Sequence, residues 1–379
     1  MTKAVIVAYA RSPFSLANKG QLIKVRADEM AMQVVKSLVA RSGVAPADIE
    51  DLLLGCSFPE GEQGLNVARL IALYAGLPLS VGGATINRFC GSSMQAIHTA
   101  VGAIACGAGD VFICGGVESM TRVPMGGFNP MPNPTLYAQM PGAYMSMGET
   151  AENVAKRYQI SRGEQEAFAV ESQKKAAAAQ EAGKLKDEII PITHKGEIVA
   201  EADSCLRPAT TLEGLATLAP AFEEDGSVTA GTSSPLTDGA SAVLVCSEDY
   251  AKKHGMKPMA RVKSFAVTGC DPEIMGIGPV GATKKALSRA GLTINDIDII
   301  ELNEAFASQS IACVRDLGID MKKVNLDGGA IALGHPLGAT GARIVGKAAS
   351  LLQREGKNYA LATQCIGGGQ GIATVLEAL

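Results

Sequence analysis

The chain contains 379 residues, of which 47% are hydrophobic and 19% charged, and its formal net charge is −4. This composition excludes a disordered chain, and the length predicts two domains or two fused halves rather than one small core. The mild negative charge and the absence of Trp give no reason to expect a nucleic-acid surface, and no apolar run approaches the roughly 18 residues of a membrane span.

The first predicted element is a strand. Met1, Thr2 and Lys3 lead directly into the apolar run Ala4 to Ala8, which leaves no room for a signal or transit peptide. The last residues, 375–379, carry no address signal. Nine cysteines without framework spacing indicate free thiols in a reducing compartment. We therefore expect a cytoplasmic protein.

A ten-residue segment occurs twice along the chain. Residues 41–50 are RSGVAPADIE and residues 289–298 are RAGLTINDID. Each copy follows a helical pattern and precedes an apolar strand, and a looser likeness continues to helices that begin after Cys90 and after His335. Strands that alternate with helices predict βαβ units, so we expect an α/β protein with a largely parallel sheet, doubled by duplication.

Residues 117–247 interrupt this pattern. The stretch 120–147 is rich in Met, Pro and Gly and predicts an irregular loop. Helices are expected over residues 149–157 and 162–183, and Ser161 with Glu164 has the pattern of a capping box. Residues 228–231 and 242–246 are expected to be strands that return to the sheet of the first half.

Cys90 lies where a strand-like run meets the small residues Gly91, Ser92 and Ser93. A thiol at a helix N-terminus is close to free backbone N–H groups and to the positive end of the helix dipole, which both favour the thiolate and can lower the thiol pKa. Such a cysteine is either a nucleophile or a buried structural residue, and the local sequence leaves both open.

Two polar residues further along have settings that favour a site. Asn303 follows the predicted strand 299–302, where its amide could orient a water or a ketone oxygen, or could cap a helix. His335 lies between glycine-rich segments and precedes Pro336, which suits a first helical position. The other three histidines lack such a setting.

Cys365 ends a strand-like run and is followed by the glycine-rich segment 366–371. Glycines at the end of a strand can expose backbone N–H groups to an oxyanion or to a phosphate, but no Walker lysine follows. The remaining cysteines lie mostly in apolar runs and predict core thiols. Because there is no Cys-x-x-Cys pair and the histidines are scattered, we expect no metal site.

Two thiols and one imidazole suit the cleavage of a carbon–carbon bond at an acyl thioester. One sulfur can carry the acyl group, while the second moves a proton to or from carbon. Four segments, taken together and in this order, resemble the motifs of the thiolases over essentially the whole chain, from Lys3 to Leu379. They are Asn87 to Ser93, Asn303 to Phe306, Gly334 to Pro336, and Cys365 to Gly371.

This resemblance implies the duplicated α-β-α-β-α thiolase fold with an inserted loop domain. It also implies a homotetramer or dimer of dimers. The expected division of the chain is a first half of residues 1–117 and 248–256, rejoined by about 228–247, an inserted loop domain of residues 118–227, and a second half of residues 257–379.

The resemblance also implies roles by position. Cys90 would accept the acyl group and His335 would activate it, while Cys365 would protonate the departing acetyl-CoA carbanion and then deprotonate coenzyme A, or the reverse in synthesis. Asn303 with a water, together with His335, would hold one thioester oxygen. The backbone N–H groups of Cys90 and Gly367 would hold the other.

Coenzyme A is thus implied as a substrate, with no permanently bound cofactor. The family pattern suggests Ser234 as a contact, although an ordinary turn serine would have the same sequence, and Arg207 near the adenine end. Apolar contacts are expected from Phe222, Leu236, Met275 and Phe306.

One departure from the family bears on the substrate. Biosynthetic acetoacetyl-CoA thiolases usually carry His-Met-Gly where this chain has Ser146, Met147 and Gly148. The lost histidine and the adaptable methionines nearby resemble the degradative 3-ketoacyl-CoA thiolases of β-oxidation. These methionines are Met120, Met125, Met131, Met140, Met145 and Met147.

Three alternatives are kept. The chain could be an acetoacetyl-CoA thiolase that condenses two acetyl-CoA molecules, or a decarboxylating ketoacyl synthase, against which Cys365 argues. It could also be a non-catalytic carrier of acyl-CoA or lipid, although no catalytic residue is missing. A β-oxidation role would allow a hydratase–dehydrogenase subunit as a partner.

Overall fold

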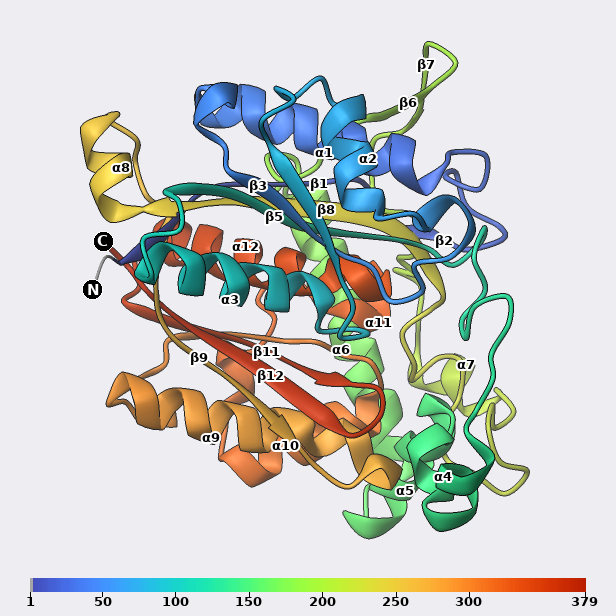
Figure 1. Cartoon of the computed structure of the whole chain (residues 1–379). Helices are drawn as coiled ribbons and strands as arrows, with labels where there is room; N and C mark the ends of the chain where they lie inside the picture. Colours follow the sequence, from blue (N-terminus) through green and yellow to red (C-terminus); the bar gives the residue numbers. More distant parts are fainter. Residues whose placement is uncertain (1–2) are drawn as a thin grey trace.

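The computed structural model describes residues 3–379 and places the main strands in two sheet halves (Figure 1). In the first half the strands follow the order β4-β3-β5-β8-β1, and in the second β10-β11-β12-β9. The bounds are β1 Ala4–Arg11, β3 Asp51–Gly55, β4 Gly82–Ile86, β5 Val111–Ser119, β8 Thr237–Ser247, β9 Ala260–Gly269, β10 Ile299–Leu302, β11 Tyr359–Ile366 and β12 Gln370–Glu377. A short seam, in which Val5 pairs with Arg261 and Ile6 with Ala260, joins β1 to β9.

The two halves repeat one strand pattern. The pairs β3–β5 and β10–β11 are parallel, whereas β5–β8, β8–β1, β11–β12 and β12–β9 are antiparallel. The parallel neighbour β4 of the first half has its counterpart in a single bridge between Ile300 and Val324. The duplication that the sequence predicts is thus present in the strand order, but the expectation of a largely parallel sheet is wrong. A tight hairpin joins β11 to β12, and strands joined in this way must run antiparallel.

Five layers result from the packing of helices on these sheets. Figure 1 shows α3 and α12 between the two sheets, α1 and α2 outside the first sheet, and α9 and α10 outside the second. Their bounds are α1 Ala27–Ser42, α2 Val67–Tyr74, α3 Ser92–Ala105, α9 Gly278–Ala290, α10 Ala307–Leu317 and α12 Leu337–Glu355. The two middle helices approach closely at Gly341, where an added Cβ would lie 2.4 Å from the backbone nitrogen of Met94. The α-β-α-β-α arrangement expected from the resemblance is confirmed.

The repeated ten-residue segment forms the same local structure in both halves. Gly43 ends α1 with φ 70° and Gly291 ends α9 with φ 68°, a left-handed conformation that glycine adopts without strain. A 3₁₀ turn follows each glycine, at Pro46–Asp48 and Ile294–Asp296.

Between β5 and β8 the chain forms a group of helices and two short strands beside the sheets. These are α4 Pro134–Gln139, a 3₁₀ turn Pro141–Tyr144, α5 Met147–Arg157, α6 Arg162–Glu181, β6 Ile192–His194, β7 Glu197–Ala200 and α7 Leu212–Ala216. The predicted capping box is present at α6, where Glu164 accepts from the backbone N–H of Ser161 at 2.8 Å. The stretch 120–147 is less irregular than expected, since it contains α4 and the 3₁₀ turn.

The expected strand at residues 228–231 does not form. The Glu152 carboxylate accepts from the backbone N–H groups of Ser227 at 3.0 Å and Val228 at 2.8 Å, and the Thr232 hydroxyl accepts from that of Thr229 at 2.9 Å. Side chains therefore take the donors that a strand would pair. The returning strand is β8, which is longer than the predicted segment 242–246.

The smaller elements complete the chain. They are β2 Ser15–Leu16, α8 Glu248–Lys253, α11 Ala330–Leu333 and the 3₁₀ turns Gly61–Gln63, Pro272–Ile277 and Met321–Lys323.

All nine cysteines are free, and most of those outside the motifs are buried as predicted. The expectation of a core thiol is wrong for Cys106, which is exposed because it lies just beyond the last turn of α3.

A buried ionic cluster surrounds α12 and fixes it in the middle layer. Arg343 pairs with Glu301 at 2.8 Å, and Lys347 pairs with Glu188 at 3.0 Å and Asp327 at 2.6 Å, with each of these side chains at most 6% exposed. Charges removed from water must be compensated by partners, so the cluster specifies one position for the helix relative to β10 and to the inserted segment.

His98 on α3 is buried against the second sheet. Its ring stacks on Phe265 with centroids 4.2 Å apart, and its Nε2 atom lies 2.8 Å from the Thr374 hydroxyl. Burial, and secondarily the charge of Arg88, lowers the pKa of His98 to about 3. The folded protein therefore holds a neutral imidazole over a pH range in which the unfolded chain becomes protonated.

We expect His98→Gln to reduce the acid sensitivity of folding. The unfolded imidazole has a pKa of about 6.5, so stability from this group is lost as the pH falls from about 6.5 towards 3, by up to about 1.4 kcal/mol per pH unit. The difference in unfolding free energy between pH 7 and pH 5 should shrink by about 2 kcal/mol in the variant, measured by urea unfolding. His254→Gln, at an exposed position, is the control and should leave that difference unchanged.

Candidate active site

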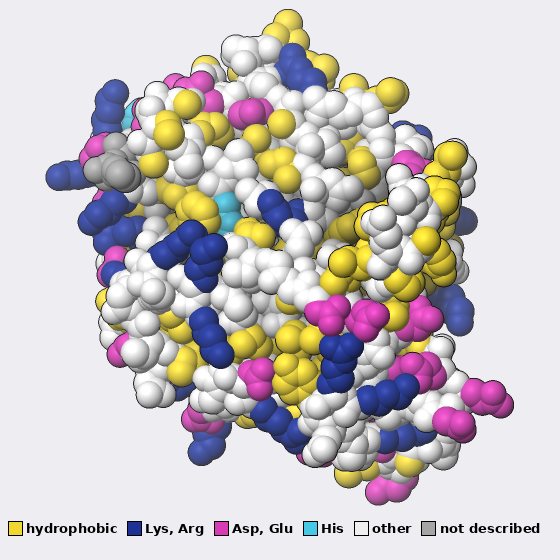
Figure 2. Space-filling model, turned by 60° about the horizontal axis from the view of Figure 1, so that its bottom comes forward, with side chains coloured by type: hydrophobic (Ala, Val, Ile, Leu, Met, Phe, Trp, Pro, Cys, Tyr) yellow, Lys and Arg dark blue, Asp and Glu magenta, His cyan; other side chains and the backbone are white. Residues whose placement is uncertain are grey.

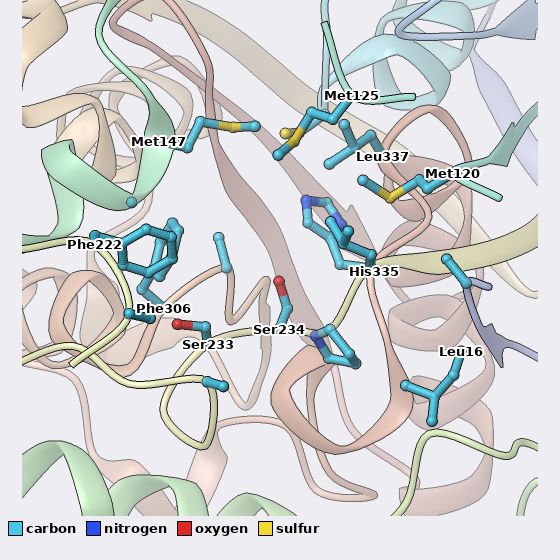
Figure 3. Close-up of a pocket in the computed structure, with 18 of the residues that line it drawn as sticks. Leu16, Met120, Met125, Met147, Phe222, Ser233, Ser234, Phe306, His335 and Leu337 are labelled. Atoms are coloured by element: carbon cyan, nitrogen blue, oxygen red, sulfur yellow. The ribbon is translucent and has the colours of Figure 1, made fainter. Parts of the chain in front are cut away.

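A cavity of about 570 Å³ opens between the two halves and the inserted segment. Figure 3 shows the side chains of Met120, Met125 and Met147 along one side, Phe222 and Phe306 on another, and His335 directed into the space between them. The cavity wall is largely apolar, with Lys19 and Arg207 as its cations. Such a space suits a ligand that has a long uncharged part and an anionic end.

The six residues predicted to contact coenzyme A, and Met147 from the predicted methionine wall, all line this cavity. They are Met147, Arg207, Phe222, Ser234, Leu236, Met275 and Phe306. Phe222 and Phe306 meet edge to face with centroids 5.9 Å apart, and the backbone N–H of Ser234 donates to the Ala305 carbonyl at 3.0 Å. These contacts fix the segment that carries Ser234 against the segment that follows Asn303.

The expected methionine wall is smaller than the sequence suggested. Met120, Met125 and Met147 line the cavity, whereas Met131 and Met140 are 83% and 50% exposed and lie outside it. Ser146 does not line the cavity either, because it is the N-cap of α5 and its hydroxyl accepts from the Glu149 backbone N–H at 3.4 Å.

Cys90 lies at the turn into α3 and lines the cavity, although its residue surface is only 1% exposed. Phe89, just before it, has φ 42°, a left-handed conformation that is strained for an aromatic residue. Burial raises the pKa of Cys90 to about 12, and the Glu118 carboxylate adds to this. The backbone N–H groups of Gly367 and of Cys90 itself hydrogen-bond to the sulfur and act in the opposite direction.

The prediction of a lowered thiol pKa is therefore wrong for the protein without ligand. The helix N-terminus favours the thiolate, but the loss of hydration in the buried turn outweighs it. The free thiol is neutral, so a base must remove its proton before the sulfur can attack a carbonyl carbon.

His335 lies at the turn into α12 and also lines the cavity. Its Nδ1 atom is 2.6 Å from the Thr340 hydroxyl, which donates its own proton to the Pro336 carbonyl at 2.9 Å. The hydroxyl must therefore accept from Nδ1–H, which leaves Nε2 free to take a proton. Burial, with a smaller effect of Arg343, lowers the pKa of His335 to about 3 and keeps the ring neutral.

We expect Thr340→Val to reduce turnover roughly 10- to 100-fold, because a buried imidazole N–H would lose its acceptor and the tautomer with a basic Nε2 would no longer be favoured. Thr340→Ser keeps the hydroxyl and should retain most of the activity. Steady-state rates of the two purified variants provide the measurement. Equal rates for Val and Ser would contradict this role of the hydroxyl.

Asn303 and Cys365 lie behind the cavity wall rather than in it. The Asn303 amide nitrogen is 3.4 Å from His335 Nε2, and its Oδ1 atom is buried without a hydrogen-bond partner in the described part of the chain, residues 3–379. Cys365 is fully buried at the end of β11, in a cluster with Met275 and Phe306, which do line the cavity.

The segments that carry the two sulfurs pack against each other, since an added Cβ at Gly91 would lie 2.7 Å from Cδ1 of Ile366. Burial raises the pKa of Cys365 well above its usual value, and ionisation of Cys90 would raise it further. The structure thus gathers Cys90, Asn303, His335 and Cys365 around one end of the cavity, although they come from both halves of the chain.

Sequence reasoning missed the residues that support this group. Glu118 is buried at the end of β5 and accepts from the backbone N–H groups of Ser57 at 2.8 Å, Phe58 at 3.2 Å and Gly338 at 2.9 Å. It therefore ties the start of α12, and with it His335, to the first sheet. A single carboxylate within an apolar strand was the available signal, whereas Lys19 and Thr340 have no distinguishing sequence pattern.

Two further findings concern the described residues, 3–379. Among them, no group of three or more His, Cys, Asp or Glu side chains is arranged to hold a metal ion. No helix in this part of the chain has the length and apolar character needed to cross a membrane.

Comparison with known proteins agrees with the geometry. Residues 4–249 match the thiolase N-terminal domain and residues 256–378 match the thiolase C-terminal domain. The 3-ketoacyl-CoA thiolase of Bacillus subtilis (strain 168) is 49% identical over 389 aligned positions that cover 100% of both chains, and that of Marinomonas sp. (strain MWYL1) is 50% identical over 382 positions, covering 98% of this chain and 97% of the relative.

Solved structures give the same result. The crystal structure of human mitochondrial 3-ketoacyl-CoA thiolase in complex with CoA superposes with a TM-score of 0.91 and 39% sequence identity, covering 100% of this chain and 98% of the human chain. With both domains matched and the fold shared over its whole length, this chain belongs to the thiolase family.

Proposed function

We propose that the protein is an acetyl-CoA C-acyltransferase that cleaves 3-ketoacyl-CoA with coenzyme A, giving acetyl-CoA and a shortened acyl-CoA in fatty acid β-oxidation. The observation that carries this proposal is the joint placement of a buried thiol, Cys90, and a neutral imidazole, His335, in the wall of one apolar cavity. Relatives that are about half identical over nearly full length are named 3-ketoacyl-CoA thiolases.

The first half-reaction uses all four residues. His335 Nε2 takes the proton of Cys90, and the sulfur attacks C3 of the substrate, whose oxygen becomes negative and accepts from the N–H groups of Cys90 and Gly367. The C2–C3 bond breaks, and its electrons form the acetyl-CoA enolate. His335 and Asn303, acting through a water, hold the enolate oxygen while the Cys365 thiol gives its proton to C2.

The second half-reaction restores the enzyme. The Cys365 thiolate takes the proton of incoming coenzyme A, whose sulfur attacks the acyl group on Cys90. Cys90 leaves as a thiolate and recovers its proton from His335. The raised pKa of Cys365 supports its role as a neutral acid at the start, and the two steps predict ping-pong kinetics.

The apolar character of the cavity supports the proposal that the substrates are 3-ketoacyl chains longer than four carbons. Met120, Met125, Met147 and Leu337 form part of the apolar cavity wall, and Met120, Met147 and Leu337 pack in one cluster with Cys90, whereas Ser146 does not line the cavity. A flexible methionine surface adapts to ligands of different length. A condensing acetoacetyl-CoA thiolase has no need of this additional apolar surface.

A thiolysis series from four-carbon to sixteen-carbon 3-ketoacyl-CoA, followed by loss of the enolate absorbance, tests the proposal. We expect turnover with medium and long chains that at least equals turnover with acetoacetyl-CoA. Activity with acetoacetyl-CoA alone would favour the biosynthetic type. A folded sample that turns over none of them would identify a carrier instead.

A dimer of dimers is the proposed assembly. β4 is an edge strand, and exposed apolar side chains lie near it at Leu65, Leu70, Leu73, Tyr74 and Leu79. A second apolar set is exposed between β5 and α5, and Figure 2 shows hydrophobic side chains gathered on a lobe of one face of the molecule. Large exposed apolar patches mark association sites. Sedimentation equilibrium measures the expected tetramer mass.

The remaining assignments concern domains, compartment and partners. The proposed division is residues 1–117 and 248–256 with the return at about 228–247, the inserted domain 118–227, and the second half 257–379, supported by the ends of β5 and β8 and by the two matched domains. Nine free cysteines support a cytoplasmic location. A β-oxidation role supports a hydratase–dehydrogenase subunit as a partner.

A further inference from the structure

The hairpin that carries Cys365 has a glutamine on each side of its loop. Gln364 lies in β11 directly before Cys365, and Gln370 opens β12 after the glycines 367–369. Within the motif Cys365 to Gly371 the proposed mechanism gives roles to the thiol and to Gly367 but none to Gln370, and Gln364 lies outside the motif. Both glutamine side chains reach across to the segment that carries the other thiol, Cys90, although 274 positions separate Gln364 from it.

Gln364 holds the backbone of Cys90 itself. Its amide nitrogen donates to the Cys90 carbonyl oxygen, and the whole side chain is buried. This carbonyl lies before α3, which begins at Ser92, so it is not part of the helix itself. A buried amide that donates to it fixes the position of the nucleophile's main chain relative to β11.

Gln370 holds the same segment two residues earlier. Its side-chain oxygen accepts from Arg88 Nη1 at 2.7 Å, while Arg88 Nε donates to Gln95 on α3 at 2.9 Å. The guanidinium therefore joins the start of β12, the nucleophile turn and α3. Two separate contacts, one at Cys90 and one at Arg88, therefore restrict the movement of this turn.

Close packing shows that little space separates the two segments. An added Cβ at Gly91 would lie 2.7 Å from Cδ1 of Ile366, the residue after Cys365. Phe89 is held at φ 42°, a conformation that persists only where the surroundings enforce it. The turn therefore needs external support in order to keep this geometry.

From these contacts we infer that Gln364 and Gln370 form a clamp that sets the separation of the two reacting thiols, and that both are positioning residues for the proposed thiolysis. Neither touches the reacting carbons. Their effect is on the distance between the sulfur that bears the acyl group and the sulfur that moves the proton. A misplacement of about 1 Å in such a pair can cost roughly 100-fold in rate. The inference rests on the proposed function in one respect, namely that thiolysis is the reaction whose rate the clamp affects.

The two glutamines use opposite ends of their amides, which gives a sharp test. Gln364 donates, so Gln364→Glu can replace it only when the carboxyl group is protonated. Gln370 accepts, so Gln370→Glu keeps the contact with Arg88 at any pH at which the carboxylate is charged. Methionine at either position keeps the length and removes the hydrogen bond.

The experiment measures thiolysis of acetoacetyl-CoA between pH 6 and pH 9 and the rate of Cys90 alkylation by iodoacetamide, in a Cys106→Ser background that removes the exposed thiol. We expect kcat to fall roughly 10- to 100-fold in Gln364→Met with KM changed less than about threefold. The kcat of Gln364→Glu, expressed relative to the parent at the same pH, should rise as the pH falls. Gln370→Glu should recover most of the rate that Gln370→Met loses, across the whole range.

A role limited to packing gives a different result. Gln364→Met would then have kcat within about twofold of the parent, and the two Glu variants would share one pH dependence; either finding overturns the clamp. If Gln364→Met does not fold, the contrast between the two Gln370 variants decides the question. If the parent protein shows no thiolysis, the proposed function is wrong. The clamp is tested separately: a rate of Cys90 alkylation in Gln364→Met that equals the rate in the parent would overturn it.

Discussion

Cys90→Ser is expected to lower thiolysis by at least about 1,000-fold and to abolish the acyl-enzyme, since a serine hydroxyl is a far weaker nucleophile in a site where even the thiol is kept neutral by burial. The substitution keeps the size of the side chain and its place at the turn into α3. Intact-mass measurement after incubation with a 3-ketoacyl-CoA should show one acyl adduct on the parent and none on the variant.

Cys313→Ser is the matched control for this experiment. Cys313 is also a buried thiol, and its sulfur donates to the Gly276 carbonyl at 3.3 Å, a contact that a hydroxyl can make equally well. We expect it to retain activity and adduct formation. An acyl adduct of equal stoichiometry on Cys90→Ser would remove Cys90 from the proposed mechanism.

Cys365→Ser is expected to separate the two halves of the chemistry. Cys90 and His335 remain intact, so the variant should still take up an acyl group, but a serine hydroxyl is a poor acid towards the enolate carbon. Loss of a general acid typically costs 100- to 10,000-fold, and we expect roughly this decrease in thiolysis. Deuterium exchange at C2 of acetyl-CoA in heavy water, which requires that proton transfer alone, should disappear.

Together, mass and exchange measurements make this division of labour testable. Acyl uptake without exchange in Cys365→Ser, and neither in Cys90→Ser, is the expected pattern. Full thiolysis by Cys365→Ser would show that the proton moves by another route. Loss of acyl uptake in a folded Cys365→Ser sample would show that Cys365 acts earlier, in the activation of the nucleophile.

The sequence predicts much of this site because the proposed reacting residues stand beside glycine-rich turns. Cys90, His335 and Cys365 are each adjacent to such a segment, and the repeated segments at 41–50 and 289–298 indicate the duplication that brings distant parts together. The layers follow from alternating strands and helices. Seven predicted ligand contacts line one cavity, but Met147, Arg207 and Phe222 come from the inserted segment rather than from the duplicated halves.

What the sequence does not predict depends on depth and on contacts across the chain. The pKa of Cys90 is raised rather than lowered because the extent of burial at the turn cannot be read from neighbouring residues. The acceptor for His335 Nδ1 is Thr340, an unremarked helical residue, and the carboxylate that ties the start of α12 is Glu118, 220 positions before Gly338. The predicted strand direction was wrong for β11 and β12, because a hairpin joins them instead of a crossover connection.

The duplicated frame has a final electrostatic consequence. Cys90 precedes α3 and His335 precedes α12, so the proposed nucleophile and the proposed base occupy corresponding places in the two copies. Their helices direct two amino-terminal ends, each equivalent to about half a positive charge, at a single cavity. The duplication thus places two positive helix ends side by side, and in the proposed reaction both would stabilise the negative charge that passes from sulfur to oxygen.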